Sequence, residues 1–487
     1  MSNTNRKRQR DGEKVDYLGK QLEMIKSRPP QTVFHFPSDL EFPQYLTDTF
    51  PQEQYRSRKF DVKTCVHWGQ RKLLLSEIQL LTKYCEPGVS YHIVYAGSAP
   101  GTHLAFLDDM FNSRHTWELV DPGQFDTAVL GDRKNFSLRN EFFTNSTAYG
   151  INARRVREFH PYLGALYAHL TSSAKEHAKK ELHEKLKDSI GTIDVARGTT
   201  DIPSMYEIPL SLPRGFNLLC EVAQERCKPL LFVSDIRSGS LDLPNFEEHV
   251  QENMKAQECW TQLLNGKYSM LKFRLPYTWV SVAGESKPVR NTTTIREDGT
   301  VPYLRGEILL PIWTRPTSTE GRLVVPQDAF QVPYNVEKVE DQFFYFNSRM
   351  REQFHFNHVV RNNDYLDHHY DATAEVRCLQ EYLRFTRPEL KGASDEVISS
   401  EVIKISNRIT ACLKVSFEDA IRRRDALVLR QAAQNAPKNT DTHGKTTLAD
   451  VVRALVAQGT VERERAVWKE NMDETQAYDS PKEWVKS

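Results

Sequence analysis

The segment Tyr91-His-Ile-Val-Tyr-Ala-Gly-Ser-Ala-Pro-Gly-Thr-His103 decides the fold class of this chain. Its first half is apolar, with β-branched and aromatic side chains, which predicts a buried central strand. Gly97 and Gly101 then predict a tight turn in which the backbone passes close to another group. We expect an α-helix over residues 104–111 to follow, with Thr102 as its N-cap, because the apolar residues recur there at helical spacing.

A glycine turn between a strand and a helix is where α/β proteins hold nucleotide-like ligands. The pattern is Gly-x-x-x-Gly rather than the Gly-x-Gly-x-x-Gly of dinucleotide-binding enzymes, so an ordinary strand-to-helix turn is the competing interpretation. The next predicted strand, Trp117-Glu-Leu-Val-Asp121, ends in an acid that suits the diol of a ribose. S-adenosylmethionine and NAD both carry such a ribose, so the fold class is clearer than the cofactor.

Composition narrows the class of protein. The 487 residues suffice for two or three domains or for one enlarged domain with extensions. Lys+Arg and Asp+Glu both number 65, so any RNA site must be a local basic patch. The seven cysteines are scattered without a Cys-x-x-Cys pair, which indicates reduced thiols and no zinc module. No run approaches the roughly 20 apolar residues that cross a membrane, so we expect no membrane association.

Four charged residues interrupt or border apolar elements. In chain order they open a helix, close a strand, lie within a strand and start a strand: Lys72, Asp235, Lys272 and Glu307. A charge in apolar sequence tends to be buried, and a buried charge needs a partner. Each of the four, taken singly, is equally compatible with a side chain that faces solvent.

Taken together, four motifs resemble the poxvirus cap-specific mRNA 2′-O-methyltransferase family. They are Gly69-Gln-Arg-Lys-Leu-Leu-Leu-Ser-Glu77, Tyr95-Ala-Gly-Ser-Ala-Pro-Gly-Thr-His103, Ser234-Asp-Ile-Arg-Ser238 and Leu271-Lys-Phe-Arg-Leu-Pro-Tyr277. Their order and approximate spacing agree with that family over about residues 69–347, apart from a charged insertion. The size and the basic N-terminus resemble most the kinetoplastid cap 2′-O-ribose methyltransferases.

The resemblance implies a Rossmann-like, S-adenosylmethionine-dependent methyltransferase fold of the α/β class. The predicted parts are a flexible basic tail (1–30), an aromatic lead-in on the cap side (31–68), the methyltransferase domain (69–347) with a helical insertion at about 150–215, and a mostly helical C-terminal extension (348–487). The helical stretch 396–434 of that extension either packs against the core or docks RNA or a partner.

By the same resemblance, a catalytic Lys-Asp-Lys-Glu tetrad falls on Lys72, Asp235, Lys272 and Glu307. A ribose 2′-hydroxyl must lose its proton as it attacks the methyl group. Lys272 is expected to act as the base or to hold the 2′-oxygen, and Lys72 to supply a neighbouring positive charge that favours a neutral amine. The two acids would orient the amines. No metal is expected, because the sulfonium is already an activated leaving group.

The resemblance also implies the residues that bind cofactor and substrate. The S-adenosylmethionine site is expected to contain Gln70, Tyr95, Gly97, Gly101, His103 and, on the ribose, Asp121. A 7-methylguanine cap stacks between aromatic rings, while acids read its edge. The resemblance assigns cap contacts to Tyr277 and Glu340 and a place at the site's edge to Arg237. Tyr45 and Tyr55 both remain candidates for the second ring.

The predicted function is therefore methylation of a ribose near the capped 5′ end of RNA, beyond the first transcribed nucleotide. The alternative is a catalytically silent cap- or RNA-binding subunit of an RNA-processing complex, although such a subunit needs no lysine base. An NAD-linked dehydrogenase is disfavoured by the glycine pattern. The cluster Asn5-Arg-Lys-Arg-Gln-Arg10 suggests nuclear import, with a solvated tail as the other interpretation.

Overall fold

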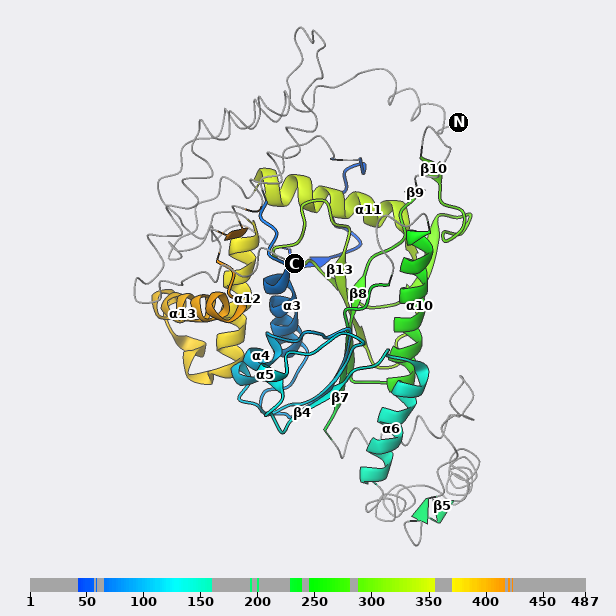
Figure 1. Ribbon diagram of the computed structural model, residues 1–487. Coiled ribbons are helices and arrows are strands. Elements are labelled where there is room, and N and C mark those ends of the chain that lie inside the picture. Colours follow the sequence, from blue (N-terminus) through cyan, green and yellow to red (C-terminus); the bar gives the residue numbers. More distant parts are fainter. Residues whose placement is uncertain are drawn as a thin grey trace, which may run out of the picture.

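The computed structural model describes residues 43–56, 58, 65–159, 193–194, 199–200, 228–238, 245–280, 288–354, 370–416, 419–420 and 423. The predicted basic tail, most of the predicted insertion and the end of the C-terminal extension lie outside the described residues. The described part is organised around one eight-stranded sheet with helices on both faces (Figure 1).

The strand order of this sheet is β1-β12-β13-β8-β7-β2-β3-β4. The five strands from β8 to β4 are parallel, whereas β13, β12 and β1 are added antiparallel at one edge. In sheet order the strands span Tyr45–Leu46 (β1), Glu307–Leu309 (β12), Gly321–Pro326 (β13), Tyr268–Phe273 (β8), Leu230–Ser234 (β7), His92–Ala96 (β2), Thr116–Val120 (β3) and Phe136–Arg139 (β4).

Three small antiparallel pairs accompany the main sheet. They are β5 with β6 (Ile193–Asp194, Thr199–Thr200), β9 with β10 (Trp279–Val280, Val289–Arg290) and β11 with β14 (Thr300–Leu304, Gln331–Asn335).

Helices form a layer on each face of the sheet (Figure 1). One face carries α3 (Gly69–Lys83), α4 (Leu104–Met110) and α5 (Thr127–Leu130), and the other carries α6 (Asn145–Phe159) and α10 (Phe246–Leu264). Helix α11 (Val336–Tyr345) crosses one end of the sheet and continues as a π-helix, Phe346–Phe354. An outer pair, α12 (Tyr370–Thr386) and α13 (Asp395–Leu413), packs on α3, with a 3₁₀ turn, Pro388–Gly392, between them.

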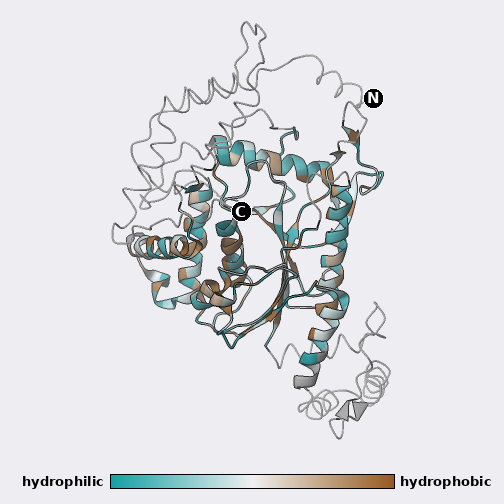
Figure 2. Cartoon of the chain, viewed as in Figure 1, coloured by the Kyte–Doolittle hydropathy of each residue, from teal (hydrophilic) through white to brown (hydrophobic). Residues whose placement is uncertain are grey.

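The apolar core lies along the central strands (Figure 2). All five residues of β7 are buried, because a parallel strand covered on both faces has no side turned to water. The helix predicted over residues 104–111 and the strand predicted over residues 117–121 are α4 and β3, and both lie within one residue of the predicted limits. The mixed α/β class with a mostly parallel central sheet confirms the predicted fold class.

Two local expectations differ from the structure. Thr102 is not the N-cap of α4, because His103 occupies that position and makes no side-chain capping hydrogen bond. Helix α6 begins at Asn145 and packs on α10, so the chain is still part of the core where the insertion was expected to start. Among the described residues, no helix is long and apolar enough to cross a membrane.

Candidate active site

The glycine turn lies where the strand order of the sheet reverses. Strand β2 has β3 on one side and β7 on the other, an arrangement that opens a crevice at the carboxyl ends of the strands. Gly97 donates its N–H to the Val120 carbonyl oxygen over 2.9 Å and has φ of +79°. A Cβ at this position would lie 3.0 Å from the backbone nitrogen of Ile236. Glycine is therefore required here both by backbone conformation and by the close approach of the β7 loop.

Glu77 of α3 holds two of the predicted cofactor residues. The Tyr95 hydroxyl donates to Glu77 Oε1 over 2.8 Å, and His103 Nε2 lies 3.1 Å from the same oxygen. All three side chains are buried. Tyr95 and His103 thus fasten the glycine turn to α3. The Nδ1 atom of His103 is buried without a hydrogen-bond partner among the described residues.

Asp121 follows β3 and faces the glycine turn. Its two carboxylate oxygens accept the backbone N–H groups of Ala99 and Gly123, over 3.1 and 2.7 Å. Each oxygen keeps a second lone pair, so the half-buried carboxylate fits a ribose diol. Gln70 is exposed in the first turn of α3, and Gly101, at φ of +70°, closes the turn. These residues fit the nucleoside part of S-adenosylmethionine.

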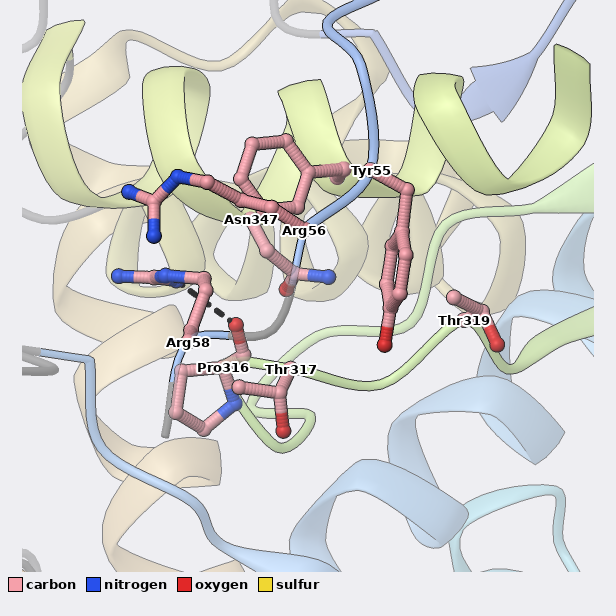
Figure 3. Close-up of a pocket in the computed structure, with 8 residues that line it drawn as sticks. Tyr55, Arg56, Arg58, Pro316, Thr317, Thr319 and Asn347 are labelled. Carbon is pink, nitrogen blue, oxygen red and sulfur yellow. Dashed lines mark hydrogen bonds between the residues drawn. The ribbon is translucent and has the colours of Figure 1, made fainter. Parts of the chain in front are cut away.

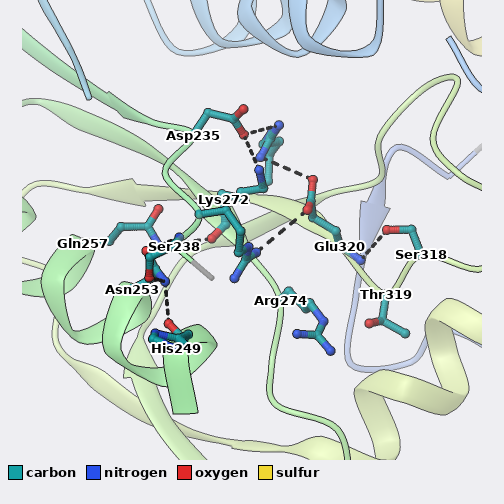
Figure 4. Close-up of polar contacts among 12 residues, drawn as sticks. Asp235, Ser238, His249, Asn253, Gln257, Lys272, Arg274, Ser318, Thr319 and Glu320 are labelled. Carbon is teal, nitrogen blue, oxygen red and sulfur yellow. Dashed lines mark hydrogen bonds and ion pairs between the residues drawn. The ribbon is translucent and has the colours of Figure 1, made fainter. Parts of the chain in front are cut away.

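Five charged side chains form a connected cluster beside this crevice. Figure 4 shows Asp235, Lys272 and Glu320 of this cluster. Lys272 Nζ lies 3.2 Å from Asp235 Oδ1, and Arg322 Nη2 lies 2.8 Å from the same oxygen. Lys72 Nζ donates to Glu320 Oε1 over 2.9 Å, and Arg322 Nη1 lies 3.6 Å from that oxygen. The structure thus brings together three of the four predicted tetrad residues.

Glu307, the fourth predicted member, lies elsewhere. It is exposed at the start of β12 and accepts the hydroxyl hydrogen bond of Tyr84 over 2.6 Å. The acid that pairs with Lys72 is Glu320, which immediately precedes β13. The structure therefore does not place Glu307 with the other three predicted residues, because it stands opposite Val324 of β13, whereas Glu320 immediately precedes the end of β13 where Arg322 faces Lys272.

Neither Glu320 nor Arg322 was predicted from the sequence as a residue of the site. They flank Gly321 at the start of the apolar run Leu323-Val-Val325. The criterion that selected Lys272, a charge embedded in an apolar strand, applies equally to Arg322. Arg237, which follows β7, also approaches the cluster, with Nη2 3.8 Å from Glu320 Oε2.

Burial and mutual charge set the ionisation of the cluster. Burial lowers the pKa of Lys72, although the Glu320 carboxylate partly counters this effect. Burial alone would raise the pKa of Asp235 and of Glu320, yet neighbouring cations hold both values below the usual range: Arg322 and Lys272 for Asp235, Lys72 and Arg322 for Glu320. Three cations and two carboxylates leave an excess of one positive charge when all are ionised, and Arg322 adds to burial in lowering the pKa of Lys72.

An aromatic pair lies next to the residue before Glu320, because the Thr319 hydroxyl donates to the Tyr277 hydroxyl oxygen over 3.3 Å. The rings of Tyr55 and Tyr277 are 5.6 Å apart between centroids and tilted by 33°. The Arg274 guanidinium lies 4.3 Å from the Tyr277 ring centroid. Glu247 accepts from Arg274 Nη2 over 2.6 Å and from the Tyr277 N–H over 2.9 Å. Of the two candidates for the second ring, Tyr55 contacts Tyr277, whereas Tyr45 lies in β1 beneath Lys83.

The aromatic pair is closed in this structure. A base stacked between two rings needs roughly 7 Å, twice the van der Waals contact distance. The adjoining cleft holds about 20 Å³, which is room for a water molecule and not for a purine (Figure 3). It is lined by Tyr55, Arg56, Arg58, Pro316, Thr317, Thr319, Phe344 and Asn347.

Glu340 of α11 holds Thr278, the residue that follows Tyr277. Its Oε1 atom accepts the N–H of Thr278 over 2.7 Å, and its side chain is buried. Burial raises the pKa of Glu340 to about 7.

Among the described residues, no three His, Cys, Asp or Glu side chains gather closely enough to hold a metal ion. That the reaction needs no metal stays a prediction.

Comparison with known proteins connects this geometry to a family. Residues 41–157 match the family model described as "Poly A polymerase regulatory subunit". Proteins named cap-specific mRNA (nucleoside-2′-O-)-methyltransferase from the Lausanne and Uriarra strains of Myxoma virus are each 42% identical over 76 residues. Each alignment covers 15% of this chain and 22% of the relative, so the chain spans about a fifth of the length of these curated relatives.

The matched segment contains α3 with Lys72, the glycine turn and Asp121, and the remaining cluster residues come from later strands of the same sheet. Over residues 41–157 the chain is thus similar to the family described as "Poly A polymerase regulatory subunit", and over 76 residues it is similar to viral proteins named cap-specific mRNA (nucleoside-2′-O-)-methyltransferase.

Proposed function

We propose that this protein transfers a methyl group from S-adenosylmethionine to a ribose 2′-hydroxyl near the capped 5′ end of RNA. One observation carries the proposal. Two lysines, each paired with its own acid and joined through Arg322, lie beside the glycine turn and Asp121 at the carboxyl ends of parallel strands. The similarity to viral proteins named for this reaction supports it.

S-adenosylmethionine, when bound near Asp121 and the glycine turn, supplies an electrophilic methyl group. Lys272, in its neutral form, is placed to accept the proton of the 2′-hydroxyl at Nζ. Asp235 orients that amine, and Arg322 keeps Asp235 ionised through the 2.8 Å contact. Glu320 holds Lys72 in the second pair, and the Lys72 ammonium would stabilise the developing oxyanion.

On the substrate side, Tyr55 and Tyr277 would separate to admit the cationic base of the cap. An ionised Glu340 would then accept hydrogen bonds from the guanine edge. Arg237 borders the tetrad and would contact the RNA backbone at the site's edge. We further propose a nuclear enzyme of the kinetoplastid type that acts beyond the first transcribed nucleotide. The basic cluster 5–10 supports the nuclear location from sequence alone, since it lies outside the described residues.

The test is transfer of labelled methyl to a short capped RNA by wild type and by Lys272→Ala. Lys267→Ala is a matched control, because Lys267 precedes the same strand but pairs with Glu86 on the opposite end of the sheet. We expect transfer by wild type and the control, and a loss of about 10²–10⁴-fold in Lys272→Ala, the usual contribution of a general base. Nuclease mapping of the product then locates the methylated nucleotide.

The description of the matching family model as a regulatory subunit favours a second candidate, a silent RNA-binding subunit. Tight binding of capped RNA by wild type without any methyl transfer, under conditions where S-adenosylmethionine binds, would replace the first proposal with this one.

A further inference from the structure

The helix that carries Lys72 is anchored from the C-terminal side of the chain. Arg71, the residue before Lys72, is completely buried. Its Nε atom donates to Glu375 Oε2 of α12 over 2.7 Å, and its Nη2 atom forms an ion pair with the other oxygen of that carboxylate. Helix α13 adds Thr410 Oγ1, which accepts from Arg71 Nη1 over 3.0 Å. The orientation of α3 thus depends on α12 and α13.

The same carboxylate also holds the segment that leads to Glu320. Trp313 Nε1 donates to Glu375 Oε2 over 2.7 Å, and the Trp313 backbone N–H donates to Asp371 Oδ1 over 2.7 Å. Trp313 has φ of +60°, a backbone conformation that a bulky residue adopts only when its surroundings enforce it. The two hydrogen bonds to the buried acids Glu375 and Asp371 therefore hold Trp313 in this unfavourable backbone conformation.

Further hydrogen bonds continue from this anchor along the connection between β12 and β13. Arg351, which pairs with Asp371, donates to the Thr314 carbonyl oxygen over 2.9 Å. Asn347 Nδ2 donates to the Ser318 carbonyl oxygen over 2.8 Å, and the Ser318 hydroxyl oxygen accepts the Glu320 N–H over 3.2 Å. The position of Glu320 is therefore fixed by contacts that start at α12.

We infer that Glu375 is a positioning residue of the active site: one buried carboxylate holds α3 through Arg71 and the Glu320 segment through Trp313, and so sets the Lys72–Glu320 ion pair. Glu375 touches neither of the paired groups. It lies more than two hundred residues beyond the segment that matches the viral family, in a helix for which that match assigns no role. The effect on catalysis rests on the proposed function, whereas the effect on the ion pair does not.

Trp313→Phe tests the inference with a matched control elsewhere in the fold. It removes the indole N–H that ties the Glu320 segment to Glu375 and leaves the Arg71–Glu375 pair in place. Trp117→Phe removes the same kind of bond, because Trp117 Nε1 donates to the buried Asp108 Oδ1 over the same 2.7 Å. Asp108 also has an arginine partner, Arg133, at 3.3 Å. The two variants should therefore lose similar stability in thermal unfolding.

Two readouts separate positioning from general loss of stability. In methyl transfer at saturating substrates, we expect Trp313→Phe to lower kcat by about 10- to 100-fold, the scale of a small misplacement, while Trp117→Phe stays within about 3-fold of wild type. In trace acetylation with acetic anhydride, read by peptide mass spectrometry, Lys72 should react several-fold faster in Trp313→Phe than in wild type or Trp117→Phe, because its ion pair with Glu320 opens.

Equal acetylation of Lys72 in the two variants would overturn the inference, whatever the enzyme does with RNA. If wild type transfers no methyl group, the acetylation result still decides whether Glu375 and Trp313 set the ion pair, so a failure of the proposed function is distinguishable. If acetylation of Lys72 rises in Trp313→Phe but kcat does not change, Glu375 and Trp313 set the ion pair as inferred. The ion pair then does not limit methyl transfer, and this result would contradict the inferred effect of Glu375 on catalysis.

Discussion

Arg322 lies directly opposite Lys272 in the antiparallel pairing of β13 with β8, and both side chains contact Oδ1 of Asp235. Arg322 is almost completely buried. An arginine remains charged at any accessible pH. The pairing therefore gives Asp235 one permanent cation, and of the two side chains only the Lys272 amine suits the proposed role of base.

Arg322→Gln tests this division of roles. Arg322 is the strongest influence that keeps the pKa of Asp235 low against its burial, so the variant should raise that pKa. Since the Asp235 carboxylate is then protonated at a higher pH as the solution is acidified, acid unfolding of the variant should begin at a higher pH than that of wild type. We also expect kcat to fall by about 10- to 1000-fold at neutral pH. Acid unfolding at an unchanged pH would contradict the role of Arg322.

Glu320→Gln and Glu307→Gln decide which acid completes the cluster. Glu320 pairs with Lys72, while Glu307 is exposed and binds Tyr84, so only the first substitution leaves a lysine of the cluster without its partner. Methyl transfer should fall at least tenfold in Glu320→Gln and stay within twofold of wild type in Glu307→Gln. The reverse ranking would restore Glu307 to the tetrad.

Tyr55→Ala and Tyr45→Ala separate the two candidates for the second stacking ring. Stacking on one aromatic ring contributes about 1–3 kcal/mol, which corresponds to roughly 5- to 150-fold in affinity. Because Tyr55 contacts Tyr277 and Tyr45 does not, the loss should appear in Tyr55→Ala alone. Titration with capped and uncapped RNA of one sequence isolates the cap contribution. An equal loss for both RNAs would argue against cap stacking.

Glu340 should make cap binding and stability depend on pH in opposite directions. Burial raises its pKa to about 7 in the folded protein, from a usual 4.5. The folded state therefore loses stability as the pH rises from about 5 to about 7, by at most about 3 kcal/mol, because the buried group must ionise. Affinity for capped RNA should rise over the same interval, since only the ionised group accepts two hydrogen bonds. Chemical unfolding and cap titration of Glu340→Gln should both lose this dependence.

Gly97→Ala and Gly88→Ala test the close approach at the glycine turn. Both glycines have nearly the same φ, +79° and +80°, so both alanines incur a similar strain of about 1–2 kcal/mol. A Cβ at Gly97 would meet the backbone of Ile236 at 3.0 Å, whereas no atom lies within 4 Å of one at Gly88. Only Gly97→Ala should weaken S-adenosylmethionine binding, by tenfold or more in calorimetry. Equal affinities would place the cofactor away from this turn.

Local patterns were sufficient for the elements that build the crevice. The apolar run of β3 and the helical spacing of α4 predict these elements to within one residue of their observed limits, because burial on both faces or along one stripe shows directly in the order of apolar residues. The positions of Lys72 and Lys272 could be predicted in the same way. The edge formed by β13 and β12 could not, because antiparallel strands far apart in sequence carry no local mark of their partner.

The sequence by itself determined the α/β class, the glycine turn and the cluster residues Lys72, Asp235 and Lys272. Only the tertiary structure decided which glutamate faces Lys72. Glu307 begins β12, whereas Glu320 ends the chain that joins β12 to β13, and the register that sets Arg322 against Lys272 brings Glu320 to the cluster. Tertiary packing likewise gave Glu375 its contacts with Arg71 and Trp313, since a buried charge selects its partners by proximity in space.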